Sequence, residues 1–184
     1  MKKYARVLIC LMLFLFIVLS SYKIVLMMNP YTQEQEQWLD YFAGGEKVAG
    51  DYTSLEFAHM DDVKRIMERI NYVVYICLIS VLGIIFYYRK DKKELSYLGY
   101  YGGIISVLGG VLLLLMMIFS FNLVFNVFHQ IFFPQGNWQF PTEALLIQTF
   151  PLDFFISLSV KIFLLALFLG LMFWGTGYYL RKKI

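Results

Sequence analysis

The sequence is poor in charged residues and in cysteine. Asp, Glu, Lys and Arg make up 16% of its 184 residues, whereas about a quarter of a typical soluble domain is charged. Its two cysteines, Cys10 and Cys77, each lie inside an apolar stretch. A disulfide scaffold and a cysteine metal site are therefore not supported, and both residues are expected to be packed or lipid-facing thiols.

Several kinds of functional motif are also missing. The basic residues form no stripe with interleaved aromatic residues, so the formal net charge of +3 does not indicate nucleic-acid binding. No glycine-rich phosphate loop is present, and Ser54, the nearest candidate nucleophile in the polar segments, lacks an elbow motif. Two distant histidines, His59 and His129, make a poor metal site. We therefore expect no metal and no cofactor, and any nucleophile would belong to the substrate.

Apolar and aromatic residues are present in excess, at 60% and 19% of the chain, with a mean hydropathy of +0.64. They gather in four blocks of roughly 20 residues, the length that a helix needs to cross a bilayer. The first block is too long for a typical signal peptide and no cleavage site follows it, so we expect a retained anchor. We predict an all-α membrane protein whose four transmembrane helices span about residues 7–28, 71–88, 97–122 and 154–180.

The basic residues predict how the four helices are oriented. Residues 123–153 contain no Lys or Arg, and in residues 29–70 the acidic residues outnumber the basic ones. The opposite side is strongly basic, which marks it as cytoplasmic. We therefore expect a plasma-membrane protein with both termini in the cytoplasm. The basic residues on that side are Lys2, Lys3, Arg6, Arg89, Lys90, Lys92, Lys93, Arg181, Lys182 and Lys183.

The two outward segments, residues 29–70 and 123–153, are predicted to form one small extracytoplasmic cap of helices and loops. In the first, Thr32 followed by Gln35 is typical of a capping box and predicts a helix start. A second helix is expected from about Ser54 into the second span. The second segment is unusually aromatic for a loop, which suits the headgroup level of a bilayer.

The second outward segment is also expected to contain a short helix over residues 142–147, before the last span begins.

His59 is the first candidate for chemistry. The helical spacing of apolar residues places it on the buried face of its helix. Glu56 lies three residues before it and Asp62 three residues after it, so either carboxylate could orient or charge the imidazole. The simpler interpretation, that each histidine is an interfacial residue bonded to backbone or lipid, stays open.

His129 is the second candidate, because Asn122, Asn126 and His129 follow i, i+4, i+7 spacing and form one polar stripe. Lys161 lies about two turns inside the fourth span, where a charge is costly and often functional. We expect its side chain to reach the outer interface or the asparagines of that stripe.

Two groups of residues form a recognisable pattern. The first is Glu56-x-x-His59-x-x-Asp62-Val63-Lys64. The second is Phe128-His129-x-x-Phe132-Phe133, followed by Trp138-x-Phe140 and Leu146-Ile147-x-x-Phe150-Pro151-x-x-Phe154-Phe155. Together with the order of the spans, this pattern resembles the bacterial lipoprotein intramolecular transacylase family over nearly the whole chain.

The resemblance implies a four-span enzyme that acts on a diacylglyceryl-modified lipoprotein with a free N-terminal amino group. It implies transfer of the sn-2 acyl chain from the glyceryl group to that amino group, which gives the lyso-form lipoprotein. The family's two catalytic histidines correspond to His59 and His129. An aromatic cap seated on lipid would suit a reaction that mainly needs donor and acceptor held together. Its expected lining residues are Trp138, Phe128, Phe132 and Phe140.

We further expect His129 to act as general base with polar support from Asn122 and Asn126, and Asp62 to keep His59 charged as acid or electrophile. Exchanged roles stay open, as do two other functions. A membrane assembly factor or transporter subunit that binds lipid through the cap would tolerate Asn or Gln at both histidines. An acyltransferase with a separate phospholipid donor would add an acyl chain to its product.

Overall fold

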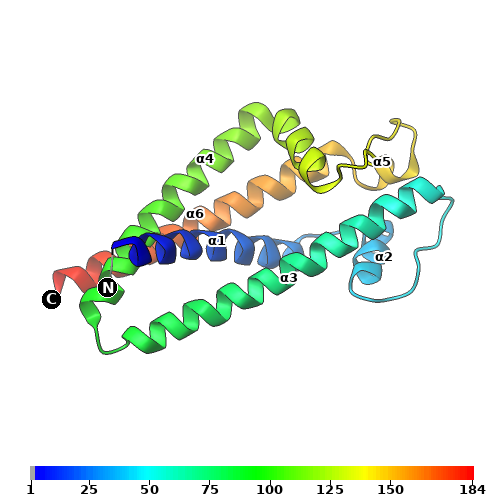
Figure 1. Cartoon of the computed structure of the whole chain (residues 1–184). Helices are drawn as coiled ribbons and strands as arrows, with labels where there is room; N and C mark the ends of the chain where they lie inside the picture. Colours follow the sequence, from blue (N-terminus) through cyan, green and yellow to red (C-terminus); the bar gives the residue numbers. More distant parts are fainter. Residues whose placement is uncertain (1–2) are drawn as a thin grey trace.

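A computed structural model describes residues 3–184 and is shown in Figure 1. Lys2, which the charge pattern assigns to the cytoplasmic side, lies outside the described residues. The described chain is helical and contains no strand, so the predicted all-α class is confirmed. Its helices are α1 (Lys3–Met28), α2 (Gln33–Phe42), α3 (Ser54–Tyr88), α4 (Lys92–Phe132), α5 (Leu145–Thr149) and α6 (Leu152–Lys182).

Four of these helices are long and apolar enough to cross a membrane. They are α1, α3, α4 and α6, with 26, 35, 41 and 31 residues, and the most apolar part of each has a mean hydropathy between 2.2 and 2.7. Between 11% and 22% of those parts is buried inside the protein, so most of their side chains are at least partly exposed. Apolar side chains that point away from the protein need a lipid solvent. The prediction of a four-helix membrane protein is confirmed.

Glycines allow α4 and α6 to approach backbone to backbone. A Cβ atom at Gly103 would lie 2.3 Å from the backbone nitrogen of Trp174, and one at Gly177 would lie 2.1 Å from that of Tyr100. Neither separation is possible for non-bonded atoms, so both positions require glycine. Small residues at helix crossings provide close packing where lipid removes the hydrophobic driving force. The glycine-rich third span therefore packs as its composition indicates.

α4 extends beyond the predicted third span into the segment assigned to the cap. The apolar block ends near residue 122, but the helix continues to Phe132, as the predicted polar stripe of Asn122, Asn126 and His129 requires, with non-helical dihedral angles at Ser120 (φ −142°, ψ 32°). Polar residues such as Asn122 end an apolar block without ending a helix. Pro134 supplies the stop, because proline disfavours helical geometry in the residue before it. The segment beyond the kink carries His129.

The cap packs around Trp38, which is fully buried together with Val48, Met60 and Leu146. The predicted capping box of Thr32 and Gln35 is present at the start of α2. The predicted helix from Ser54 is α3, whose own capping box pairs Thr53 with Glu56.

The short helix of the cap, α5, begins at Leu145 rather than at the predicted residue 142. Ala144, which has an extended backbone, precedes it, while Thr142 bonds to the neighbouring Glu143 instead of capping a helix. In Figure 1 the cap lies at one end of the bundle, and both termini lie at the other end beside the α3–α4 turn.

Candidate active site

The two histidines meet although 70 positions separate them in the chain. His59 comes from the cap part of α3 and His129 from the part of α4 beyond the kink. Their ring centroids are 6.1 Å apart and the rings are nearly parallel, at 26°. They are 7% and 9% exposed. One substrate group can therefore reach both imidazoles at once.

Aromatic side chains enclose the histidine pair. Phe133, 2% exposed, contacts both imidazoles from one side, with its ring 4.7 Å from that of His59 and 5.3 Å from that of His129. Phe140 contacts His59 at 5.8 Å, and Trp138 contacts His129 at 4.8 Å. The expected lining residues Trp138 and Phe140 therefore contact the pair. Phe133, which was not among the expected lining residues, contacts both rings, and the ring of Phe125 lies 4.0 Å from that of His129.

The other two expected lining residues lie further out. Phe128 contacts His129 edge-on at 5.4 Å, and Phe132 stacks on Phe128 at 4.6 Å. Their exposed fractions are 42% and 47%. They form an outward aromatic margin of the site. Because Phe132 and Phe133 are neighbours at the end of a helix, the sequence alone did not show which of them faces inward.

His129 has a fixed tautomer. Its Nδ1 lies 2.8 Å from the backbone carbonyl oxygen of Phe125, one turn earlier in α4. A carbonyl oxygen only accepts, so Nδ1 carries the proton and Nε2 of the neutral ring keeps its lone pair. Burial lowers the pKa of His129 below its usual value, against the opposing effect of this hydrogen bond. The neutral ring therefore has one nitrogen, Nε2, with a free lone pair.

His59 is buried without a fixed partner. Its Nδ1 is inaccessible to solvent and has no hydrogen-bond partner within residues 3–184. Burial lowers the pKa of His59 to about 4, and the nearby His129 acts in the same direction, while Asp62 opposes both. The imidazole is therefore neutral at physiological pH. The geometry does not support the expectation that Asp62 keeps it charged.

Glu56 does not orient His59; it joins two segments of the cap. One carboxylate oxygen accepts hydrogen bonds from the backbone N–H and the hydroxyl of Thr53, at 2.7 and 2.8 Å. The other accepts the backbone N–H of Leu146 in α5, at 2.8 Å. Burial opposes ionisation, but these bonds hold the pKa of Glu56 below its usual value. This carboxylate, 2% exposed, stabilises the cap rather than the imidazole.

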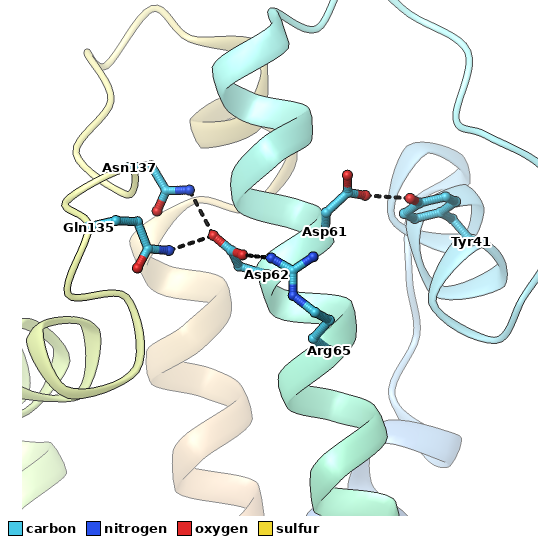
Figure 2. A network of polar contacts seen from close by, with 6 residues as sticks. All are labelled: Tyr41, Asp61, Asp62, Arg65, Gln135 and Asn137. Carbon is cyan, nitrogen blue, oxygen red and sulfur yellow. Dashed lines mark hydrogen bonds and ion pairs between the residues drawn. The ribbon is translucent and has the colours of Figure 1, made fainter.

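Asp62 likewise bonds away from His59, as Figure 2 shows. Its carboxylate accepts hydrogen bonds from Gln135 at 2.5 Å and Asn137 at 2.8 Å, and it pairs with Arg65 one turn later in α3. Burial opposes ionisation, but Asn137, Gln135 and Arg65 together hold the pKa of Asp62 below its usual value. Asp62 therefore ties the loop after α4 to α3.

The remaining predicted residues lie outside the histidine pair. Asn122 and Asn126 are exposed, and Asn122 lines a surface hollow of about 300 Å³ at the α4 kink. Support for His129 comes from the Phe125 carbonyl instead. Lys161 donates to the side-chain oxygen of Asn29 at 2.7 Å, so it reaches the end of α1 and not the asparagine stripe.

A second hollow, of about 270 Å³, adjoins the aromatic enclosure, because Phe133 and Trp138 both line it. Gln130, Pro134, Gly136 and Gln139 complete its wall. Across residues 3–184, no three His, Cys, Asp or Glu side chains gather in a way that could hold a metal ion. The chemistry that this site offers is acid–base chemistry by two neutral, buried imidazoles enclosed by aromatic side chains.

Residues 47–155 match the model of a protein family described as lipoprotein intramolecular transacylase Lit. An uncharacterised protein from Aquifex aeolicus (strain VF5) is 25% identical over 126 residues, which are 68% of this chain and 56% of that protein. The chain therefore spans little more than half the length of this curated relative.

The fold is that of a solved membrane enzyme. The in meso structure of the membrane integral lipoprotein intramolecular transacylase Lit from Bacillus cereus superposes with a TM-score of 0.74 at 21% identity, covering 99% of this chain and 98% of that one. The same protein with a histidine-to-alanine mutation gives a TM-score of 0.71 at 22% identity, over 98% and 95% of the two chains.

Proposed function

Because the chain belongs to the lipoprotein intramolecular transacylase family, a family of acyltransferases, we propose that it makes lyso-form lipoproteins. Its substrate would be a diacylglyceryl-modified lipoprotein, and the reaction would move the sn-2 acyl chain from the glyceryl oxygen to the α-amino nitrogen of the N-terminal cysteine. The observation that supports this most is the buried pair of imidazoles, His59 and His129, 6.1 Å apart inside an aromatic pocket.

His129 would act as the general base. Its Nδ1–H is held by the Phe125 carbonyl, so Nε2 is the nitrogen that can accept a proton from the substrate amine. As the amine loses this proton, its lone pair forms a C–N bond to the sn-2 ester carbonyl carbon and a tetrahedral intermediate results. The C–O bond to the glyceryl oxygen then breaks, and that oxygen takes up the proton. The base returns to its starting state.

His59 would act as a neutral hydrogen-bond donor. An unpartnered buried Nδ1 is free to carry a proton and point it at the ester oxygens of a bound substrate. Donors that are positioned before the reaction stabilise a developing oxyanion strongly in a site that excludes water. His59 would therefore act as an electrophile in its neutral form. The positive charge that Asp62 was expected to stabilise on His59 is not needed for this role.

The aromatic pocket would supply proximity. Donor ester and acceptor amine belong to one substrate molecule, so the protein needs to hold them in a reactive geometry, which can lower a barrier by on the order of 7–11 kcal/mol. Phe133 and Trp138 exclude water from the imidazoles and line the adjoining hollow. The chemistry as proposed uses no cofactor, since the amine is the nucleophile and the glyceryl oxygen the leaving group.

We further propose that the cap faces away from the cytoplasm. The described basic residues at the helix ends, such as Arg6, Lys90 and Arg181, belong to the end of the bundle that holds both termini and the α3–α4 turn (Figure 1). Lys and Arg near span ends mark the cytoplasmic side. A cap on the opposite side would meet lipoproteins in the outer leaflet.

The test replaces His59 or His129 by Ala and co-expresses each variant with a lipoprotein whose N-terminus is analysed by fragmentation mass spectrometry. We expect each variant to lose N-acylated lyso-form product, by about 10²–10⁴-fold for a proton-transfer role. Gln148→Ala, at an exposed cap residue, is the matched control. Normal product from either histidine variant would contradict its catalytic role. Product with three acyl chains would show an intermolecular donor instead.

A further inference from the structure

The side-chain amide of Asn137 has a hydrogen-bond partner for its nitrogen but none for its oxygen. Its Nδ2 donates to the Asp62 carboxylate at 2.8 Å, whereas its Oδ1 is inaccessible to solvent and has no hydrogen-bond partner in the described chain. Because a carboxylate only accepts, the amide cannot be turned over without setting oxygen against oxygen. A buried carbonyl oxygen without a partner is unfavourable, and such groups in native proteins call for an explanation.

Asn137 belongs to the loop that contacts the histidine pair through Trp138 and Phe140. Asp62 lies one helical turn after His59 on α3, and Trp138, the residue after Asn137, contacts His129 at 4.8 Å with its ring tilted. Figure 2 shows Asn137 and Gln135 reaching the Asp62 carboxylate from the loop while Arg65 reaches it from α3. Gln135, Asn137 and Arg65 all contact Asp62, and the Asp62 carboxylate in turn orients the Asn137 amide in the loop next to Trp138.

We propose that Asn137 Oδ1 accepts a hydrogen bond from the α-amino group of the substrate's N-terminal cysteine, and that Asp62 is the positioning residue that orients it. This rests on the proposed function. The ester and ether-type atoms of the diacylglyceryl group offer only acceptors, so an acceptor in the protein selects the amine end. A neutral amine has two N–H bonds and one lone pair. With one N–H on His129 and the other on Asn137, the lone pair is left to attack the sn-2 carbonyl.

The test is a binding measurement that needs no turnover. The probe is a dialkyl-ether analogue of a diacylglyceryl-cysteinyl peptide, which has no ester to transfer, and its partner probe has the α-amino group replaced by hydrogen. In detergent micelles we expect the wild-type protein to bind the amino probe about 5–20-fold more tightly than the desamino probe, the size of one hydrogen bond to an amine. In Asn137→Ala the ratio should fall to within about 2-fold.

Two further variants separate recognition from folding. Gln135→Ala also removes a bond to Asp62, but Gln135 is exposed, so the ratio should stay as in the wild type. Asp62→Asn removes the acceptor that orients Asn137, and its ratio should fall as in Asn137→Ala. A wild-type ratio in Asn137→Ala, with both affinities lowered alike, would overturn the proposal and leave Asn137 a structural residue.

A third probe tests whether Asn137 binds the first peptide N–H of the substrate instead of the amine. It keeps the α-amino group but has an ester oxygen in place of the first peptide N–H. If the wild-type protein binds this probe more weakly than the amino probe, and Asn137→Ala binds the two equally, the proposal would be overturned. Asn137 would then bind the peptide N–H. If the amino-to-desamino ratio depends on Asn137 while no acyl transfer occurs, amine recognition stands and the proposed reaction fails. If acyl transfer depends on both histidines while the amino-to-desamino ratio does not change in Asn137→Ala, the proposed reaction stands and amine recognition by Asn137 fails.

Discussion

Acid should destabilise the folded protein through His59. Its pKa in the folded protein is about 4, lowered mainly by burial, against 6.5 in the unfolded chain. Between these two values the unfolded chain binds a proton that the folded protein does not. Stability is therefore complete above about pH 6.5 and is lost as the pH falls from 6.5 towards 4.

The size of the effect follows from the two pKa values. At about pH 5 nearly every unfolded chain carries the His59 proton and few folded molecules do, which corresponds to a loss of about 2 kcal/mol relative to about pH 7.5. The pKa of His129 is also lowered, so it acts in the same direction. No other histidine is present in the sequence.

The assay is denaturant unfolding in detergent micelles at about pH 7.5 and 5, with wild type beside His59→Gln. Glutamine keeps a polar side chain of similar size and does not titrate. We expect wild type to lose about 2 kcal/mol more than the variant between the two pH values. Equal losses would refute the reasoning, because they would mean that His59 is either solvated or kept charged by Asp62.

Three other predictions address the base, the cap and the bundle. If His129 is the base, it must be neutral to accept a proton, so kcat/KM should rise with pH with a midpoint below 6.5 that belongs to His129. A second rise near pH 8 is expected from the substrate amine. A midpoint above pH 6.5 for the rise that belongs to the enzyme would exclude His129 as the base. Glu56→Ala leaves the N–H groups of Thr53 and Leu146 unpaired and should cost about 1–3 kcal/mol of unfolding free energy, against less than about 0.5 for the exposed Glu143→Ala. Gly177→Ala places a Cβ against the α4 backbone and should cost about 1–3 kcal/mol or more, whereas Gly175→Ala meets nothing within 4 Å and should be close to neutral, by the same unfolding measurement.

Carboxylate roles show where inference from spacing failed. Glu56 and Asp62 lie three residues on either side of His59, which on a helix indicates proximity. Each carboxylate instead contacts other groups: Glu56 accepts from Thr53 and the α5 backbone, and Asp62 contacts Arg65 and the loop that follows α4. Helical spacing limits which side chains can meet, but segments that pack across the helix decide which ones do.

The polar stripe on α4 shows a related difference. Asn126 and His129 share one helical face, yet Asn126 is exposed and His129 is 9% exposed. Trp138 and Phe133 cover the end of the helix that carries His129 and leave the preceding turn open. Helical periodicity predicts which residues share a face of the helix. How deeply each of them is buried depends on the segments that pack over that face.

The sequence by itself determined the four membrane helices, the capping box at Thr32 and the identity of the two candidate imidazoles. These depend on local properties, because a membrane helix satisfies its own backbone hydrogen bonds and needs only length and apolar composition. Tertiary structure alone decided that His59 and His129 meet and that Asp62 holds Asn137. These depend on the α4 kink and on contacts between residues far apart in the chain, and no local pattern encodes them.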